Sequence, residues 1–148
     1  MLYLLFHVKD ESYAVNVREV IEVVPQVKLR SIPKAPEYIA GLLNYRGETV
    51  PVLDLCLLLH DRKCAAVFGS RIVLVKYPDT RGTQRILGLL AEQVTDTLQC
   101  EAEEFRPSTL VHTSAPYLRE VTTYRDHLVQ RVDVSALLPA EVQLLLFR

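Results

Sequence analysis

The chain has 148 residues, 49% of them hydrophobic, and its 17 basic side chains almost balance its 18 acidic ones, which leaves a formal net charge of −1. This composition describes one soluble domain with a buried core, and the even spread of charge excludes a basic surface for nucleic acid or anionic lipid. The longest apolar runs fall far short of the roughly 20 residues that cross a bilayer and no signal peptide is recognisable, so we expect a cytoplasmic protein without direct membrane insertion.

Strands dominate the predicted secondary structure. Short segments rich in Val, Ile, Leu and Tyr are separated by turn-like pieces at a spacing of roughly 8 to 12 residues, which is typical of an all-β barrel or sandwich. The clearest alternation of apolar and polar residues lies in residues 27–32. In chain order, the predicted strands are residues 2–8, 12–16, 27–32, 42–46, 49–53, 71–77, 85–91, 94–100, 119–124 and 128–134.

The predicted helices are few and short. Apolar residues between Val17 and Val24 follow a helical spacing, after a candidate N-cap at Asn16 and before Pro25, which ends the run. The other predicted helical segments are one turn that begins at Pro36, residues 54–59 with Asp54 as the cap, and residues 139 to about 146.

A polar stretch near residues 60–70 interrupts the apolar pattern and separates two halves of similar size. A half of this size, about 70 residues, builds only a marginal core by itself. We therefore expect residues 1–148 to form a single domain, with two subdomains that divide near residues 60–70 and pack together as one cooperative unit.

The cysteines suggest a metal site only weakly. Cys56, Cys64 and Cys100 cannot all pair within one chain and form no C-x-x-C motif, so we expect reduced thiols. Spacings of four place Cys56, His60 and Cys64 near one helix face, as in some metal sites. The charged residues after His60 predict that the helix ends before Cys64, and no fourth ligand stands nearby. We therefore expect a buried Cys56, an exposed His60 and a loop Cys64, with no metal and no other cofactor.

No catalytic motif is assembled in the sequence. The four histidines are candidate bases by composition only, no G-x-S-x-G motif is present, and residues 112–114 are interpreted as a polar loop. Neither G-x-G-x-x-G nor a P-loop pattern occurs among the five glycines, which disfavours nucleotide binding. We expect a non-enzymatic protein that works by surface recognition.

The most informative segment lies between Pro33 and Leu55. It reads P-x-x-P-x-x-I-x-G-x-x-N-x-R-G-x-x-x-P-V-x-D-L. Local chemistry predicts a turn that starts at proline, a glycine exit, two strands joined by a tight turn at Arg46 and Gly47, and a capping Asp54. Taken alone, the segment is a well-specified β-hairpin.

The segment also resembles the CheW family of bacterial chemosensory adaptors, whose hallmark is a P-x-x-I-x-G-x-x-N-x-R-G turn followed by P-V/I-x-D-L. The resemblance covers nearly the whole chain and is weaker in the second half. It implies an all-β fold of two packed, five-stranded SH3-like β-barrels with a few short helices. It also implies a scaffold that couples the regulatory domain of a CheA-type histidine kinase to the cytoplasmic tip of methyl-accepting chemoreceptors in membrane-associated arrays, with other CheW-like proteins as further candidate partners.

Two family positions carry over individually. Glu22 matches an acidic position and Arg46 matches the arginine of the N-x-R-G turn; in relatives both are implicated in contact with the kinase or receptor. We expect Glu22 and Arg46 to lie close together in one recognition patch. The alternative is an exposed ion pair worth about 0 to 1 kcal/mol with no partner role. The candidate partner-binding residues are Val20, Glu22, Ile39, Gly41, Leu42, Asn44, Arg46 and Gly47.

The sequence leaves the burial of several residues and the class of function undecided. The sequence does not distinguish a surface position from a core position for Val20, Ile39 and Leu42. Residues 144–147 fit either packing on the second barrel or an exposed docking surface. A different class of function, a small-ligand or metal-responsive sensor, could use the same barrels, with the Cys56, His60 and Cys64 cluster or a cleft between the halves as its site.

The second half departs from the family pattern at specific positions. Glu120 stands where relatives carry glycine, which removes an easy site for positive φ and adds a charge. Gln130 and Arg131 replace residues that are commonly apolar. Because relatives use this half for receptor binding and array contacts, we expect a specialised adaptor from an alternative chemosensory system rather than from flagellar chemotaxis.

Overall fold

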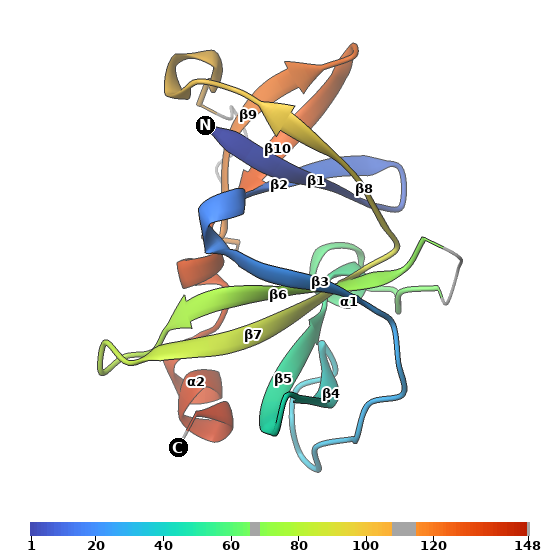
Figure 1. The fold of residues 1–148 in the computed structure, drawn as a ribbon, viewed down its shortest axis with the longest axis vertical. Helices are drawn as coiled ribbons and strands as arrows, with labels where there is room; N and C mark the ends of the chain where they lie inside the picture. The colour runs from blue at the N-terminus through green and yellow to red at the C-terminus, as the bar shows by residue number, and fades with distance from the viewer. Residues whose placement is uncertain (66–68, 108–114, 148) are drawn as a thin grey trace.

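The computed structural model describes residues 1–65, 69–107 and 115–147 and shows two five-stranded antiparallel-rich sheets, one above the other (Figure 1). We call them barrel A and barrel B. Barrel A contains β1 (Leu2–Val8), β2 (Glu11–Asn16), β8 (Gln93–Gln99), β9 (Leu118–Tyr124) and β10 (His127–Val132). Barrel B contains β3 (Val20–Pro25), β4 (Ile39–Tyr45), β5 (Glu48–Asp54), β6 (Arg71–Pro78) and β7 (Gln84–Ala91). This is the all-β, two-barrel architecture predicted from the sequence.

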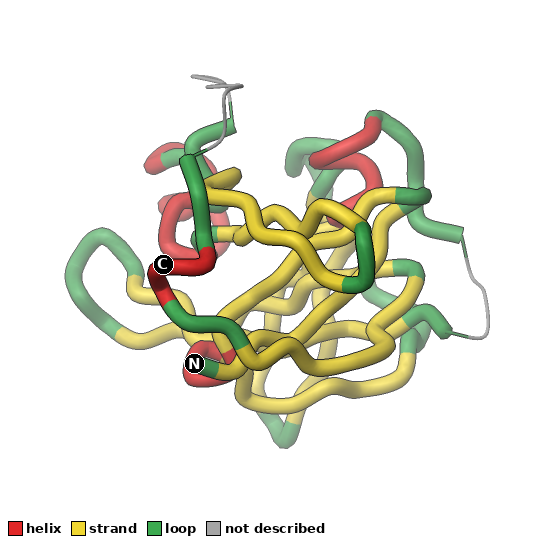
Figure 2. The backbone as a smooth tube through the Cα atoms, turned by 90° about the horizontal axis from the view of Figure 1, so that it is seen from above, coloured by secondary structure: helices red, strands yellow, loops and turns green. Residues whose placement is uncertain are grey.

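Short helices lie at the periphery of the strands (Figure 2). The α-helices are α1 (Leu55–His60) and α2 (Ala140–Leu146), and the 3₁₀ turns are η1 (Val17–Glu19), η2 (Ala102–Glu104) and η3 (Val134–Ala136). Asp54 caps α1, as predicted, because its carboxylate accepts hydrogen bonds from the backbone N–H groups of Cys56 and Leu57. The helix predicted near the end of the chain is also present, as α2.

The two barrels have the same strand order. Barrel A runs β8-β1-β2-β10-β9 and barrel B runs β3-β6-β7-β5-β4. In each sheet, one edge is the strand that follows the crossing from the other barrel, and the other edge is the first strand of a hairpin. Each sheet also contains one parallel pair, which is β2 with β10 in barrel A and β5 with β7 in barrel B. β8 and β9 of barrel A thus correspond to β3 and β4 of barrel B.

The chain does not pass between the barrels near residues 60–70, where the sequence suggested a division. Strands on both sides of that stretch, β5 and β6, belong to barrel B. The crossings lie instead at η1 and between β7 and β8. The polar residues near 60–70 belong to the connection between α1 and β6, whose sequence looks like a boundary because surface loops and linkers share a composition.

A hydrophobic core between the barrels unites them. Phe6 and Val15 of barrel A lie in one buried cluster with Val73 and Leu89 of barrel B. Each barrel also has a smaller hydrophobic core of its own. The core of barrel A includes Leu98, and barrel B has a separate core. Burial of apolar surface across the barrel boundary supports the expectation that the halves pack as one unit.

Three predicted elements are wrong. Residues 17–24 form only the single 3₁₀ turn η1 and then enter β3, because Val20 to Pro25 find hydrogen-bonding partners on β6 and alternate in exposure, as a strand does. Residues 27–32 form no strand; their backbone pairs with β4 only through Arg30 and Leu42. The residues after Pro36 form turns, not a helical turn, before β4 begins. Pairing of strands therefore overrides local helical spacing here.

Candidate partner-binding site

The turn at the tip of the β4–β5 hairpin positions the predicted arginine. Tyr45 and Glu48 are paired across the hairpin, and Arg46 and Gly47 between them have φ of 49° and 82°. Positive φ at both central residues is the geometry of a type I′ turn, which matches the twist of a two-residue hairpin. Glycine adopts it without steric cost, which explains the R-G pair at this place. Arg46 therefore extends from an ordered turn.

Glu22 meets this turn from the opposite edge of barrel B. One of its carboxylate oxygens, Oε1, accepts hydrogen bonds from Arg46 Nη2 at 3.0 Å and from Tyr45 Oη at 3.2 Å. The Arg46 guanidinium also lies over the Tyr45 ring, 5.2 Å from its centroid. The expectation that Glu22 and Arg46 lie close together is confirmed. We call Glu22, Tyr45 and Arg46 the barrel B patch.

The barrel B patch joins two strands that are not paired with each other. β3 and β4 are the edge strands of barrel B, so its sheet is open between them. The contacts of Glu22 with Tyr45 and Arg46 connect these edges through side chains. The Arg46 side chain is 74% exposed and that of Glu22 is 37% exposed, so both stay accessible to a partner. Burial and the neighbouring Glu22 carboxylate raise the pKa of Tyr45, which keeps this phenol a hydrogen-bond donor.

The other predicted site residues fall into different environments. Ile39 is buried in the shared core, and Val20 is partly buried against it. Leu42 is half-buried and its backbone pairs with Arg30. Asn44 and Gly47 are exposed beside Arg46. The structure thus distinguishes core from surface where the sequence does not.

Gly41 permits a close approach of two backbones. Its φ is +150°, and a Cβ at this position would stand 2.6 Å from the carbonyl oxygen of Arg30. A larger residue would therefore push away the segment that covers the outer edge of β4. Gly41 acts on the site by shaping this edge, since the glycine itself is buried.

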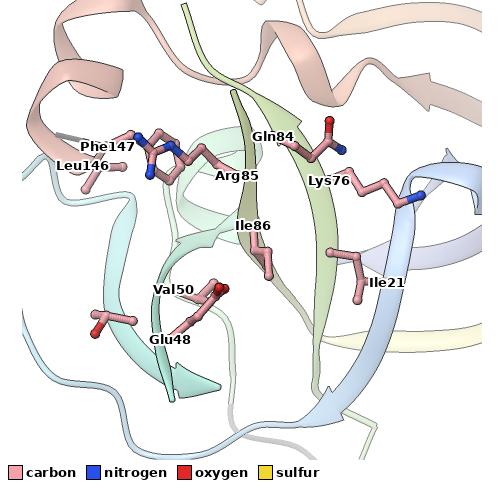
Figure 3. Close-up of a pocket in the computed structure, with 10 residues that line it drawn as sticks. Ile21, Glu48, Val50, Lys76, Gln84, Arg85, Ile86, Leu146 and Phe147 are labelled. Carbon is pink, nitrogen blue, oxygen red and sulfur yellow. The ribbon is translucent and has the colours of Figure 1, made fainter. Parts of the chain in front are cut away.

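Sequence reasoning missed a groove next to the barrel B patch. The cavity has a volume of about 590 Å³, with β6 and β7 at its centre and β3 and β5 on either side, and α2 contributes at one end (Figure 3). Ile21 and Ile86 supply apolar surface, and Lys76 and Glu48 supply charge. Ile21 and Val23, which the helical assignment had hidden, are each more than a third exposed on β3. Strand alternation in residues 20–25 was the signal that could have found them.

The end of the chain closes one side of this groove. Phe147 is buried and stacks on Tyr77 of barrel B with ring centroids 5.8 Å apart, and the Arg85 guanidinium lies 5.8 Å from its centroid. Leu144 remains 57% exposed on α2. Residues 144–147 thus combine packing with an exposed apolar side chain, although the packing is on barrel B.

The Cys56, His60 and Cys64 cluster does not form as a metal site. Cys56 and Cys64 are joined by a disulfide, which corrects the expectation of reduced thiols for this pair, while Cys100 is free and buried. His60 instead shares a hydrogen bond with Tyr13, with Nε2 and Oη 3.1 Å apart. Among the described residues the potential ligand atoms that gather are those of Asp54, Cys56 and Cys64, but paired sulfurs offer no thiolate.

Local geometry explains why the cysteines meet. Asp61 ends α1 in a left-handed conformation, with φ of 55°, and turns the chain back. The Cys64 N–H then donates to the Asp54 carboxylate at 3.1 Å from Oδ2. The same carboxylate therefore caps α1 and holds the returning loop, which brings Cys64 onto Cys56. Spacing along an ideal helix could not predict this return.

The departures from the family pattern compensate each other in barrel A. Glu120 and Arg131 form an ion pair, with Oε2 and Nε 2.7 Å apart. The hydrogen bond from Arg131 lowers the pKa of Glu120. Glu120 does not have positive φ, and the strand pair β9–β10 forms without the glycine. The charged residues are therefore a matched pair across two strands.

Residues 112–114, which were predicted as a polar loop, lie outside the described part of the chain.

Comparisons with known proteins agree with this architecture. The CheW-like domain family matches residues 2–142. The chain is 25% identical over 141 residues to the chemotaxis protein CheW of Klebsiella aerogenes, covering 94% of this chain and 82% of that protein. It is 37% identical over 93 residues to the protein FrzA of Myxococcus xanthus, covering 57% of this chain and 58% of FrzA.

A solved structure shows the same fold. The scaffolding protein TtCheW of Thermoanaerobacter tengcongensis superposes with a TM-score of 0.82 at 25% identity, covering 95% of this chain and 89% of the other. In residues 1–65, 69–107 and 115–147, none of the helices has the length and hydrophobicity of a membrane span. The match over nearly the whole chain, together with the paired barrels, means that the chain belongs to the family of CheW-like domains.

Proposed function

We propose that this chain is a non-enzymatic adaptor that couples chemoreceptors to a CheA-type histidine kinase. The observation that carries the proposal is the barrel B patch, in which Glu22 and Arg46 are ordered by each other and by Tyr45 yet remain exposed. An exposed ion pair contributes about 0 to 1 kcal/mol to stability, so its ordered geometry is better explained by recognition than by folding.

The kinase partner binds, in this proposal, through its regulatory domain at the barrel B patch and the adjoining groove. Arg46 offers a planar guanidinium for a carboxylate or carbonyl of the partner. Ile21 and Val23 supply exposed apolar surface on the same edge strand. Apolar contact at the centre with charged groups at the rim is the usual arrangement of a specific protein interface.

The receptor tip binds on a different surface, the apolar groove at the junction of the barrels. This cavity, of about 440 Å³, is lined by side chains from the segment before β4, α1, the segment before β9 and η3. Tyr38, Leu58, Tyr117 and Leu137 make its walls predominantly apolar. A groove of this kind suits the apolar face of an amphipathic helix. Separate surfaces allow both partners to bind one adaptor at a receptor array.

The charged departures in barrel A favour a pathway other than flagellar chemotaxis. Glu120 stands where the family pattern has glycine and Arg131 where it is commonly apolar, so both add charge to barrel A. An adaptor of a separate system gains specificity when such charges disfavour the partners of another pathway.

Binding of the purified chain to the regulatory domain of the CheA-type kinase from the same organism tests the proposal. We expect saturable binding by calorimetry, and we expect Arg46→Glu to abolish it, because two carboxylates then face each other at Glu22. The melting temperature should change by no more than about 2 °C, since Arg46 is largely exposed.

The matched control is Arg18→Glu. Arg18 is exposed on η1, and its backbone N–H donates to Asn16, while its side chain has no hydrogen bond or ion pair with the described residues. This variant should bind as the wild type does. Equal loss of stability and binding in Arg46→Glu would mark Arg46 as structural and count against the proposed surface.

A further inference from the structure

Barrel A repeats the arrangement of the barrel B patch with one difference. Tyr124 ends β9 as Tyr45 ends β4, and Arg125 follows it in the hairpin turn with φ of 51°. The Arg125 guanidinium lies 5.1 Å from the centroid of the Tyr124 ring. Tyr124 Oη donates to Asp96 Oδ2 on the opposite edge strand β8 at 3.3 Å. Asp96, Tyr124 and Arg125 therefore occupy the places of Glu22, Tyr45 and Arg46.

The difference is that Arg125 has no acidic partner among the described residues. Asp96 is one methylene shorter than glutamate, and its carboxylate is used by Tyr124 Oη and by the backbone N–H of Thr97, which donates to Oδ1 at 2.8 Å. In barrel B the longer Glu22 reaches both the tyrosine and the arginine. Barrel A thus contains the arginine of the patch without the carboxylate that satisfies it.

A small cavity opens beside this arginine. It has a volume of about 260 Å³ and is lined from every strand of barrel A, including Leu5 and Val129 at its base. Two histidines line it: His7 from β1 and His127 from β10. Their counterparts in barrel B, from the strand order and pairing, are Lys76 and Glu48, which line the larger groove. The cavity in barrel A therefore has a base, His127, at the position where barrel B has an acid, Glu48.

The polar groups of the cavity are arranged for an anion. His7 Nδ1 is 3.0 Å from Ser12 Oγ, which orients the ring and leaves Nε2 for another partner. Arg125 and His127 stand at the exposed rim. The acidic group in the lining, Asp96, is already bonded to Tyr124. Asp126 lies in the adjacent turn, outside the lining. An imidazole ring N–H can donate a hydrogen bond to a carboxylate oxygen.

We propose that the mouth of barrel A binds a carboxylate group, with Arg125, His7 and His127 as its ligands. In barrel B the Glu22 carboxylate pairs with Arg46. The bound carboxylate takes the corresponding place beside Arg125 in barrel A. A planar guanidinium beside imidazole donors is suited to a carboxylate. The cavity has room for a short carboxylic acid or for the end of one acidic side chain from a protein. This site lies on barrel A and does not depend on the proposed kinase contact.

Titration of the full chain with succinate, followed by the NMR ring resonances of its histidines, tests the proposal. At pH 6 we expect saturable shifts of the His7 and His127 resonances. Arg125→Gln should abolish the shifts, whereas Arg18→Gln, which removes an exposed arginine outside the cavity, should not.

A second variant tests whether the short side chain of Asp96 is the reason that Arg125 has no carboxylate partner. Asp96→Glu gives barrel A the side-chain length found in barrel B, so its carboxylate should pair with Arg125 and block succinate while the fold is retained. No shift of either histidine at pH 6, or succinate binding that survives both Arg125→Gln and Asp96→Glu, would overturn the proposal.

Competition distinguishes the two sources of the carboxylate. If saturating succinate, or Asp96→Glu, weakens binding of the kinase regulatory domain or the receptor tip, the group comes from an acidic side chain of that partner. If partner binding is unchanged while succinate still binds, the site takes a free carboxylic acid.

Discussion

At the scale of single residues, the carboxylate of Glu92 joins segments that are far apart in the sequence. Its carboxylate accepts hydrogen bonds from the Arg62 guanidinium at 3.0 and 3.1 Å, from the Ala65 N–H at 2.9 Å and from the Lys9 N–H at 3.1 Å. It thus connects the loop after α1 with the turn between β1 and β2. The hydrogen bond from Arg62, followed by those of the two backbone groups, lowers the pKa of Glu92 to about 2.

This lowered pKa makes stability depend on pH. The ionised carboxylate is favoured by folding, so its contribution is complete above the ordinary glutamate pKa of 4.5 and is lost as the pH falls toward about 2. We expect Glu92→Gln to lower the free energy of unfolding at pH 7 by about 1 to 2 kcal/mol, because Arg62 is partly exposed and solvent screens the pair. Denaturant unfolding at several pH values measures both effects.

Glu103→Gln is the control for this prediction. Glu103 is exposed on η2, and the substitution should leave both the stability at pH 7 and its decline in acid unchanged. An acid decline in Glu92→Gln as steep as in the wild type would show that other carboxylates carry the pH dependence.

Gly41 sets the position of a backbone rather than of a side chain. In Gly41→Ala the new Cβ would meet the Arg30 carbonyl oxygen and Leu29, and we expect a loss of about 2 kcal/mol or more in the free energy of unfolding. Gly82→Ala is the matched control, because Gly82 also has positive φ, +79°, but nothing within 4 Å of the added Cβ. It should cost only about 1 kcal/mol. Equal losses in the two variants would refute the steric explanation.

At the scale of elements, the two hairpin turns solve the same problem with different residues. The turn of barrel B uses Arg46 and Gly47, while that of barrel A uses Arg125 and Asp126, with φ of 51° and 65°. Positive φ is costly for residues with a Cβ, although aspartate tolerates it better than most. The barrel A turn therefore holds conformational strain that a glycine would relieve.

We expect Asp126→Gly to raise the free energy of unfolding by about 0.5 to 1 kcal/mol. Asp126→Ala should be neutral or destabilising, because alanine has no side-chain hydrogen bond to favour the left-handed conformation. Thermal unfolding of the two variants checks the order. A stabilising alanine with no gain from glycine would contradict the account of this turn.

The elements also show what the sequence could predict. Strands and the Asp54 cap followed from alternation and local capping chemistry, because these signals act over a few residues. The spacing of apolar residues predicts a helix over residues 17–24, and only the pairing of Val20 to Pro25 with β6 shows that the chain continues there as a strand. The disulfide depended on the chain turning back at Asp61, which spacing does not encode.

At the scale of the whole molecule, the sequence contains an internal duplication that becomes visible once the strand order of the two barrels is known. Residues 38–54 and 117–133 align without a gap, with Tyr38, Tyr45 and Arg46 matched by Tyr117, Tyr124 and Arg125. In both copies a backbone N–H, of Asp54 or Asp133, donates to the carbonyl of the first tyrosine at 2.7 Å. Divergence of the other positions hides the repeat, since the shared strand order needs only pattern and size to persist.

The disulfide adds a constraint to this fold. Cys56 and Cys64 are separated by 8 positions, and a loop of that size should contribute about 2 to 3 kcal/mol when closed. We expect a reductant to lower the melting temperature of the wild type and to leave Cys64→Ser unaffected. Melting curves with and without reductant measure this. Three reactive thiols in the native, non-reduced protein would contradict the pairing.

The proposed adaptor binds two partners at the same time. The most direct test is sedimentation of the kinase regulatory domain and the receptor cytoplasmic tip, mixed with and without the full chain. We expect the kinase domain to sediment with the receptor only when the chain is present, and Arg46→Glu to release the kinase while the receptor stays bound. Competition between the two partners for the chain, so that no complex contains all three, would contradict the adaptor account.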